Sequence, residues 1–294
     1  MNITLGIILA FATMFLWGFG DFFIQRTTRK LGNWETLFII TFIGTLMLLP
    51  FSWRSFLDLF HSASATVLLA LVGSAVFLFI AAMFEFQGMK LGKIAVIEPL
   101  WSLEIIAASL MSFIILKEDL SLTQILLIAS LIVCFILLSI RERGSIKLSH
   151  FFVERGVWFA FIGATVMGIA DFFMGWGSRV SDPLLTNFSV NILAVVLSGI
   201  YLLANGKMGK LVSDLRHEPI NLLRMSFLDN FAWIAYAFAM SMAPIGIVTS
   251  LTESSIVVAV LLGLFWNKEK LQHHQKIGLV GAVVCAICLG FFAK

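Results

Sequence analysis

The stretch that decides the fold is residues 17–25, which read WGFGDFFIQ. It places the carboxylate of Asp21 near the end of an apolar run that is long enough to cross a bilayer. A related phrase returns 150 residues later, where residues 168–173 read GIADFF and carry Asp171. A charged group in hydrocarbon is costly and usually has a function. The repetition therefore predicts that two duplicated acids line a polar path shared by two halves of the chain.

Composition places the chain in a membrane. Of its 294 residues, 60% are hydrophobic and 13% are charged, with a mean hydropathy of +1.00, whereas a soluble domain carries about 25% charged residues. Continuous apolar runs of roughly 18 or more residues recur along the sequence. They predict an all-α, multi-pass membrane protein and do not fit the alternating strands of a barrel. The expected location is the lipid bilayer of the cell (plasma) membrane.

Several classes of function are excluded by the sequence. The net charge of +3 comes from basic residues in loops, so no nucleic-acid partner is expected. The three cysteines, Cys134, Cys285 and Cys288, fall within apolar runs and are expected to be free thiols. All five histidines lie in loops, and no metal-binding, nucleophile-elbow or phosphate-loop motif is present. We therefore expect no enzyme activity, no cofactor and no metal.

Ten apolar segments are predicted to cross the membrane, and no soluble domain interrupts them. They span residues 3–25, 33–52, 64–88, 94–116, 120–140, 157–178, 184–204, 223–243, 245–266 and 275–292. We expect a first five-helix repeat at residues 1–140, a connecting loop at 141–156 and a second five-helix repeat at 157–294. The charged connection at residues 205–222 is expected to be a surface loop.

The two halves are copies of one five-helix unit. At an offset of 150 residues, the matches are Gly18, Asp21, Phe22, Phe23 and Arg29 with Gly168, Asp171, Phe172, Phe173 and Arg179. At an offset of 151, they are Lys117, Glu118, Leu120, Gln124 and Cys134 with Lys268, Glu269, Leu271, Gln275 and Cys285. Because five crossings is an odd number, the second copy enters the membrane from the opposite face. The prediction is ten transmembrane helices in two inverted five-helix repeats.

These features resemble the drug/metabolite transporter superfamily, specifically its ten-helix EamA-type members. The resemblance covers nearly the whole chain and rests on the five-plus-five layout and on two matching segments, at residues 94–124 and 244–275. It implies transport of a small metabolite, often in exchange or with protons, and it names no substrate. The second copy has Ser250 where the first has Pro99, so a helix break at Pro99 is not expected to be duplicated.

The orientation in the membrane has two conflicting indications. Of the 20 Lys and Arg residues, 16 are assigned to one side of the predicted segments. The positive-inside rule then places both termini outside the cell. The family resemblance implies the reverse, with both termini in the cytoplasm. The sequence leaves the two orientations open.

Seven acids fall within the predicted segments at least three residues from their ends: Asp21, Glu85, Glu98, Glu104, Asp171, Asp229 and Glu253. Lys and Arg are absent from the interiors of these segments. A carboxylate without a partner in hydrocarbon can take up a proton, line a water-filled cavity or meet a cationic ligand. Each of these outcomes suits a transporter.

One part of a predicted substrate pocket comes from the fourth segment. Glu98 precedes Pro99, which is expected to disrupt the helix because proline lacks an N–H group. Trp101 lies one turn away, and a carboxylate beside an indole suits an amine through charge and cation–π attraction. At the repeat offset Glu253 matches Ser102, so it is expected to face the same path from the second copy. The alternative for these acids is a role in holding helices together.

The second part of the predicted pocket is a polar and aromatic set in the eighth segment. Asp229 and Asn230 lie one turn from Trp233, and Trp17 in the first segment is deep enough to line the same cavity. Glu104 is expected to point elsewhere on its helix and to have a structural role. Together these residues predict a binding site near the middle of the bilayer.

Three further acids are predicted to act as gates or proton carriers. Asp21 and Glu85 are expected beneath the basic side of the membrane, and inversion places Asp171 beneath the opposite side. The alternative for Asp21 and Asp171 is a structural acid that reaches the interface or caps a helix. For Glu85 the alternative is neutralisation by Lys90 and Lys93.

The sequence therefore predicts a secondary active transporter of a small cationic or zwitterionic metabolite, working by alternating access between the two repeats. Protons or sodium are candidate coupling ions. Within transport, the alternative is an exporter of neutral amino acids or drugs. From other classes, a membrane sensor would need an output domain and a lipid-acting enzyme would need a catalytic constellation, and neither is recognisable. Both a monomer and a homodimer are compatible with the sequence.

Overall fold

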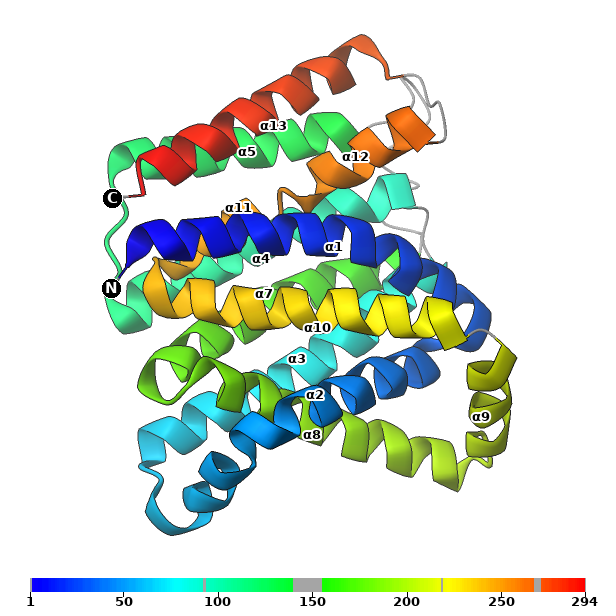
Figure 1. Ribbon diagram of the computed structural model, residues 1–294. Helices are drawn as coiled ribbons and strands as arrows, with labels where there is room; N and C mark the ends of the chain where they lie inside the picture. The colour runs from blue at the N-terminus through cyan, green and yellow to red at the C-terminus, as the bar shows by residue number, and fades with distance from the viewer. Residues whose placement is uncertain (1, 92–93, 140–154, 218, 267–270, 294) are drawn as a thin grey trace.

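The computed structural model describes residues 2–91, 94–139, 155–217, 219–266 and 271–293, and its described part is helical (Figure 1). The ten predicted crossings are present. They are α1 (Ile3–Leu31), α2 (Asn33–Ser62), α3 (Ala65–Leu91), α4 (Ile94–Met111) with a π-helical turn η1 (Ser112–Leu116), α5 (Leu122–Ser139), α7 (Arg155–Val180), α8 (Pro183–Ala204), α10 (Pro219–Met242), α11 (Ile245–Thr252) with α12 (Ser255–Trp266), and α13 (His273–Phe291).

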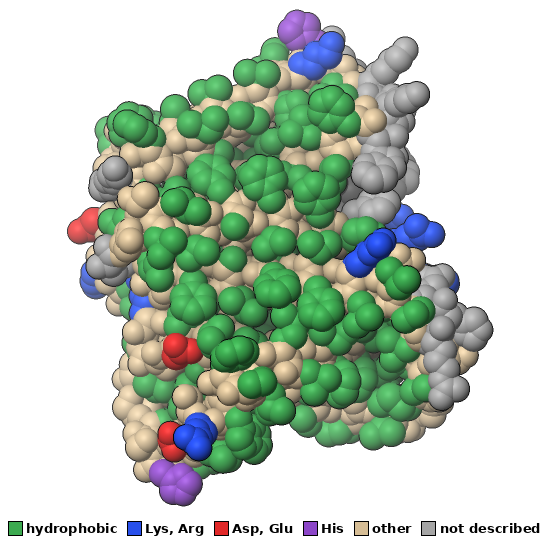
Figure 2. Space-filling view, in the orientation of Figure 1, with side chains coloured by type: hydrophobic (Ala, Val, Ile, Leu, Met, Phe, Trp, Pro, Cys, Tyr) green, Lys and Arg blue, Asp and Glu red, His purple; other side chains and the backbone are tan. Residues whose placement is uncertain are grey.

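The surface of the bundle matches a lipid environment. Eight of the described helices are long and apolar enough to cross a membrane. Apolar side chains cover most of the face shown in Figure 2, and charged side chains gather mainly toward its two ends. Large side chains such as Phe15, Val76 and Leu126 are exposed on the outside of the bundle. The chain is therefore a multi-pass integral membrane protein, as predicted.

The two copies interlock, because the main packing partner of most helices belongs to the other copy. In the first copy α1 packs along α10 and α3 packs along α7, and α1 and α3 correspond to α7 and α10 of the second. α2 packs along its own counterpart α8, and α5 along its counterpart α13. Exchanging the copies therefore maps each of these pairs onto itself or onto another pair. This is the pattern of an inverted repeat.

Two matched glutamines show the same symmetry at atomic detail. Gln124 Oε1 accepts a hydrogen bond from Ser121 N at the start of α5 (2.8 Å), and its Nε2 donates to the Phe292 carbonyl at the end of α13 (2.9 Å). Gln275 repeats both contacts from the start of α13, accepting from Gln272 N (3.0 Å) and donating to Leu138 O in the last turn of α5 (3.0 Å). Each glutamine therefore satisfies one free group at the start of its own helix and one at the end of its counterpart.

The two ends of the bundle differ in their chemistry. We call the end that holds both chain termini and the turns at 117–121 and 243–244 the terminal face (Figure 1). We call the opposite end, which holds Arg29, Lys30 and Lys207, the basic face. The connection at 205–222, predicted to be a loop, contains a short amphipathic helix on the basic face, α9 (Met208–His217), which buries Leu211.

Helix continuity differs from the expectation in both copies. α4 runs from Ile94 through Pro99 without a break. The crossing that matches it is interrupted instead, because α11 ends at Thr252 and α12 begins at Ser255. The interruption has a physical cause, since the hydroxyls of the Ser- and Thr-rich run at 249–254 hydrogen-bond to carbonyls one turn earlier and so compete with the helical backbone bonds. Glu253 lies at this break.

Candidate functional site

Acids from six different elements form one electrostatically linked group inside the bundle, which we call the acid cluster. Its members are Asp21 of α1, Glu85 of α3, Glu104 of α4, Asp171 of α7, Asp229 of α10 and Glu253 at the α11–α12 break. Mutual repulsion connects Glu253 with Asp21, Glu85, Glu104 and Asp171, and connects Asp229 with Asp21. Since these elements come from both copies, the cluster is a joint property of the two repeats.

A close contact between α4 and α7 positions two of these acids. A Cβ atom at Gly168 would lie 2.5 Å from the Glu104 carbonyl oxygen and 2.6 Å from the Ala107 Cβ, so only glycine allows the helices to approach this far. Asp171 lies one turn further along α7. The carboxyl groups of Glu104 and Glu85 lie next to each other. Because two neighbouring carboxylates repel each other when both are ionised, a proton on one of them would stabilise the pair.

A chain of hydroxyl groups joins Asp171 to α11. The carboxyl group of Asp171 lies beside the hydroxyl of Tyr236 of α10. The Tyr236 hydroxyl lies 3.1 Å from Thr249 Oγ1 on α11, and Thr249 donates in turn to the Ile245 carbonyl (3.0 Å). Tyr236 and Thr249 are fully buried. The position of α11 is therefore connected directly to the acid cluster.

Aromatic rings lie beside the acids. Trp17 of α1 packs edge-on against Trp233 with ring centroids 5.0 Å apart, and it lies 4.9 Å from the ring of Tyr236. The indole of Trp233 also lies beside the carboxyl group of Asp229. The electron-rich faces of such rings attract cations. The arrangement places aromatic rings next to carboxylates, the combination that recognises an organic amine.

The acid cluster lacks a basic partner within the part of the chain that the structure describes. The described groups that act on the six acids are other acids and hydrogen-bonding side chains, and the described ion pairs, Arg179–Glu118 and Lys207–Glu35, lie outside the cluster. Buried carboxylates without a counter-charge are costly. Protons or a bound cation can relieve this repulsion, so the cluster is suited to exchanging one for the other.

The structure brings together most of the acids predicted to act in transport and does not place them beneath opposite faces of the membrane. Asp21 and Asp171 were expected beneath opposite faces, yet both act electrostatically on Glu253. The reason is that the helices extend beyond the predicted segments. α1 continues to Leu31, past its first basic residue Arg26, so Asp21 lies deeper than the sequence indicated.

The side chain of Asn230, which was predicted to bind substrate, is bonded to helices α2 and α8 and not to the acid cluster. Its amide nitrogen donates to the Ile40 carbonyl of α2 (3.0 Å), and its oxygen accepts from Asn191 of α8 (3.4 Å). These bonds hold α2, α8 and α10 together and leave the amide occupied. We therefore do not include Asn230 in the proposed site.

Two residues of the site were not predicted, and two predicted ones are only partly placed. Glu104 belongs to the cluster, and Tyr236 bridges Asp171 to α11. The small residues at 107–108 were the available signal for the first, since they indicate close packing of that side of the helix, and the rarity of tyrosine in the chain was the signal for the second. Trp101 is half-buried, and its Nε1 has no hydrogen-bond partner among the described residues. The side chain of Glu98 lies outside the described residues.

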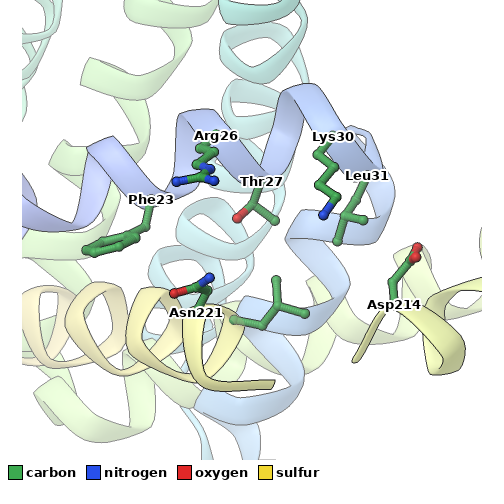
Figure 3. A pocket seen from close by; sticks show the side chains of 8 residues that line it. Phe23, Arg26, Thr27, Lys30, Leu31, Asp214 and Asn221 are labelled. Atoms are coloured by element: carbon green, nitrogen blue, oxygen red, sulfur yellow. The ribbon is translucent and has the colours of Figure 1, made fainter. Parts of the chain in front are cut away.

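A small hollow opens at the basic face (Figure 3). Its walls come from the end of α1, from α9 and from the start of α10. The lining residues are Phe23, Arg26, Thr27, Lys30, Leu31, Asp214, Asn221 and Leu222. None of these lining residues belongs to the acid cluster.

Comparisons with known proteins agree with this architecture. A solved structure titled "Crystal structure of protein" superposes with a TM-score of 0.74 over 98% of this chain and 97% of its own, at 15% sequence identity, which shows a shared fold alone. No curated protein matches the sequence. The model of the EamA-like transporter family matches twice, at residues 4–140 and 154–291. Because these two matches cover nearly the whole chain, the protein belongs to the EamA-like transporter family and is a membrane transporter.

Proposed function

We propose that this protein is a secondary active transporter of a small cationic or zwitterionic metabolite that works by alternating access. The observation that carries the proposal is the acid cluster, which gathers six carboxylates from both copies without a basic partner among the described residues. An anionic substrate would add to the repulsion already present. A cation would relieve it, so charge favours a positively charged group at this position.

The aromatic residues favour an organic cation over a bare metal ion. The rings of Trp17, Trp233 and Tyr236 pack against one another beside Asp229 and close to Asp171. A substituted ammonium group binds well to such surfaces, because it combines cation–π attraction with apolar contact. We therefore assign substrate contacts to Glu253 and Asp229 together with the aromatic rings. Trp101, with an unused indole N–H, is a further candidate for contacting an acceptor on the substrate.

Proton coupling is proposed for the remaining acids. Glu85 and Glu104 lie next to each other, where a proton on one would relieve their repulsion, and Asp21 and Asp171 lie within electrostatic range of Glu85. Arrival of a cation at Glu253 would favour loss of a proton from this group, because both compete for the same negative charge. Sodium is the alternative coupling ion. One chain contains both copies, so a monomer has every group that the mechanism uses.

Uptake into proteoliposomes tests this proposal. The variants are Asp21→Asn and Asp171→Asn, singly and combined, each of which removes a charge while keeping the size of the side chain. We expect the double variant to lose pH-driven accumulation of a cationic amine at least tenfold, in line with the loss of an essential proton-transfer group. Asp58→Asn, at an exposed position on α2, is the matched control and should transport normally.

The competing outcomes are distinct. Uptake that is unchanged in the double variant would remove the proposed role of both acids. Transport of neutral amino acids at rates above those of amines, in the unmodified protein, would instead support the exporter alternative. Accumulation driven by a sodium gradient at constant pH would replace protons with sodium as the coupling ion.

A further inference from the structure

An arginine at the terminal face holds the end of another helix. Arg179 lies in the last turn of α7, and its guanidinium reaches the final turn of α10. Nε donates to the Met240 carbonyl (2.8 Å), and Nη2 donates to the Ala243 carbonyl (2.7 Å). Both oxygens belong to the free carbonyl end of α10, where a positive charge is favoured. Arg179 therefore ties the ends of two second-copy helices together.

The same guanidinium binds an acid from the first copy. Nη1 of Arg179 donates to Glu118 Oε1 at 2.5 Å, and Glu118 Oε2 accepts from the backbone N–H of Ile245 (3.0 Å). Ile245 is the first residue of α11, and a negative charge is favoured at the start of a helix. Glu118 thus holds the start of α11 in place through a contact that crosses from one copy to the other. The two side chains are mostly buried, with exposures of 19% and 15%, so water screens the pair weakly.

α11 connects this ion pair to the acid cluster. The helix spans eight residues, which is about 12 Å, and all of them are buried. Glu118 caps its first residue by accepting the backbone N–H of Ile245. Thr249 in its middle contacts Tyr236, and its far end leads into Glu253. A change of charge at Glu253 can therefore be transmitted to the terminal face by movement of one short helix that is separated from α12 by a break.

At the opposite face the Lys207–Glu35 ion pair also joins the two copies, but the counterpart of Arg179 makes no such contact within the described residues. Arg29 matches Arg179 in the sequence repeat, yet its side chain is exposed and forms no described ion pair. The hollow lined by Arg26 and Asn221 opens on this face (Figure 3). Within the described residues, Arg179 is therefore bound at the terminal face and Arg29 is exposed beside a hollow at the basic face, while Glu269, which matches Glu118 in the repeat, lies outside the described residues.

We propose that the Arg179–Glu118 pair is the latch that keeps the terminal face closed in this conformation, and that its release frees α11 and opens the acid cluster to that face. This inference rests on the proposed transport by alternating access. A latch must hold one conformation and not the fold as a whole. Its loss should therefore change which face can reach the cluster, whereas loss of a purely structural clamp would lower the stability of every conformation.

Accessibility from each side of the membrane tests the latch. A reporter cysteine at Ser250 lies roughly 8 Å below the start of α11 and is fully buried. It is introduced by Ser250→Cys into the chain whose native cysteines have been replaced by alanine (Cys134, Cys285 and Cys288). A membrane-impermeant maleimide is applied to one face at a time, and a protease-cleavable tag after the C-terminus identifies the terminal face. Transport by the reporter chain is measured first to show that it works.

The test variants are Glu118→Gln and Arg179→Lys. The first keeps the shape and removes the charge, and the second keeps the charge and removes the forked geometry that reaches three acceptors. We expect labelling from the terminal face to rise about tenfold or more in each, the factor that loss of a charged hydrogen bond produces. Labelling from the basic face should not rise. Arg29→Lys, the counterpart in the other copy, is the matched control and should leave terminal-face labelling unchanged.

Each result decides the question. A rise confined to the terminal face, with the thermal unfolding midpoint of the variants close to that of the parent, supports the latch. Unchanged labelling in both variants, an equal rise from both faces, or an equal rise in Arg29→Lys overturns it. A lowered unfolding midpoint without a sided change identifies a structural clamp and also overturns it. Labelling requires no substrate, so a failure of the latch remains distinct from a failure of the proposed cation transport.

Discussion

Replacing Gly168 by alanine tests whether close packing of α4 on α7 holds the acid cluster together. The added Cβ would lie 2.5 Å from the Glu104 carbonyl oxygen, roughly 0.9 Å inside the 3.4 Å at which ordinary contact begins. The obstructing atom belongs to the backbone, so the two helices must separate. Overpacking of this kind costs about 1–3 kcal/mol. The separation would also draw Glu104 away from Glu85, so transport should fall together with stability.

A second glycine supplies the control. A Cβ atom at Gly20 of α1 would meet Leu228 Cβ at 3.6 Å, which is ordinary contact. Alanine is favoured over glycine inside a helix by about 1 kcal/mol. Gly20→Ala should therefore be neutral or stabilising. Since both variants gain the same helix preference, the difference between their free energies of unfolding isolates the clash and should be about 1–3 kcal/mol.

The assay is reversible unfolding in mixed micelles, in which a denaturing detergent is titrated and helix content is followed, with transport measured on the same preparations. A difference below about 0.5 kcal/mol, the range of an ordinary surface substitution, would show that α4 and α7 are not in tight contact at Gly168. Loss of transport in Gly20→Ala to the same extent as in Gly168→Ala would show that the effect is unrelated to the position of Glu104.

Further predictions concern the symmetric caps, the basic face and the buried hydroxyl. Gln124→Ala and Gln275→Ala should each lower the free energy of unfolding by about 1–2 kcal/mol, because each removes a cap and an interhelical bond, measured by the same titration. Tyr236→Phe should reduce transport more than stability, which kinetic comparison of uptake would show. At Lys207, burial acts to lower the pKa, but the hydrogen bond and charge of Glu35 together with the neighbouring tyrosine outweigh it and raise the pKa. Lys207→Met should therefore lower the free energy of unfolding by at most about 1 kcal/mol at neutral pH. This difference between variant and parent should disappear as the pH rises through the pKa of Lys207, which unfolding measured at neutral and at alkaline pH would show.

The sequence was sufficient to predict the inverted repeat, because the two halves carry the same residue types at matching positions. Gln124 and Gln275 are equivalent in sequence and make equivalent bonds in the structure. The matched glycines Gly18 and Gly168 likewise both lie at close helix contacts. Such features can be predicted from a sequence because each depends on one residue type that other residues cannot replace at that position.

The parts that could not be predicted depend on how helices are rotated and where they bend. α4 is largely apolar on every side, so apart from the small residues at 107–108 no pattern indicates that Glu104 faces α7. The break before α12 was missed because proline was taken as the sign of a break, whereas a run of Ser and Thr hydroxyls produces it at Glu253. Both features follow from contacts between distant segments, which a single sequence does not reveal.

The interlocked pairing of helices has a consequence for how this protein can move. A rocking motion of residues 1–140 against residues 157–294 would have to peel α1 from α10 and α3 from α7, which are among the most extensive contacts in the bundle. Motions that keep the α1–α10 and α3–α7 contacts intact require far less free energy. Any rigid unit that shifts during a transport cycle should therefore draw helices from both halves, and the line along which the molecule opens should not follow the order of the chain.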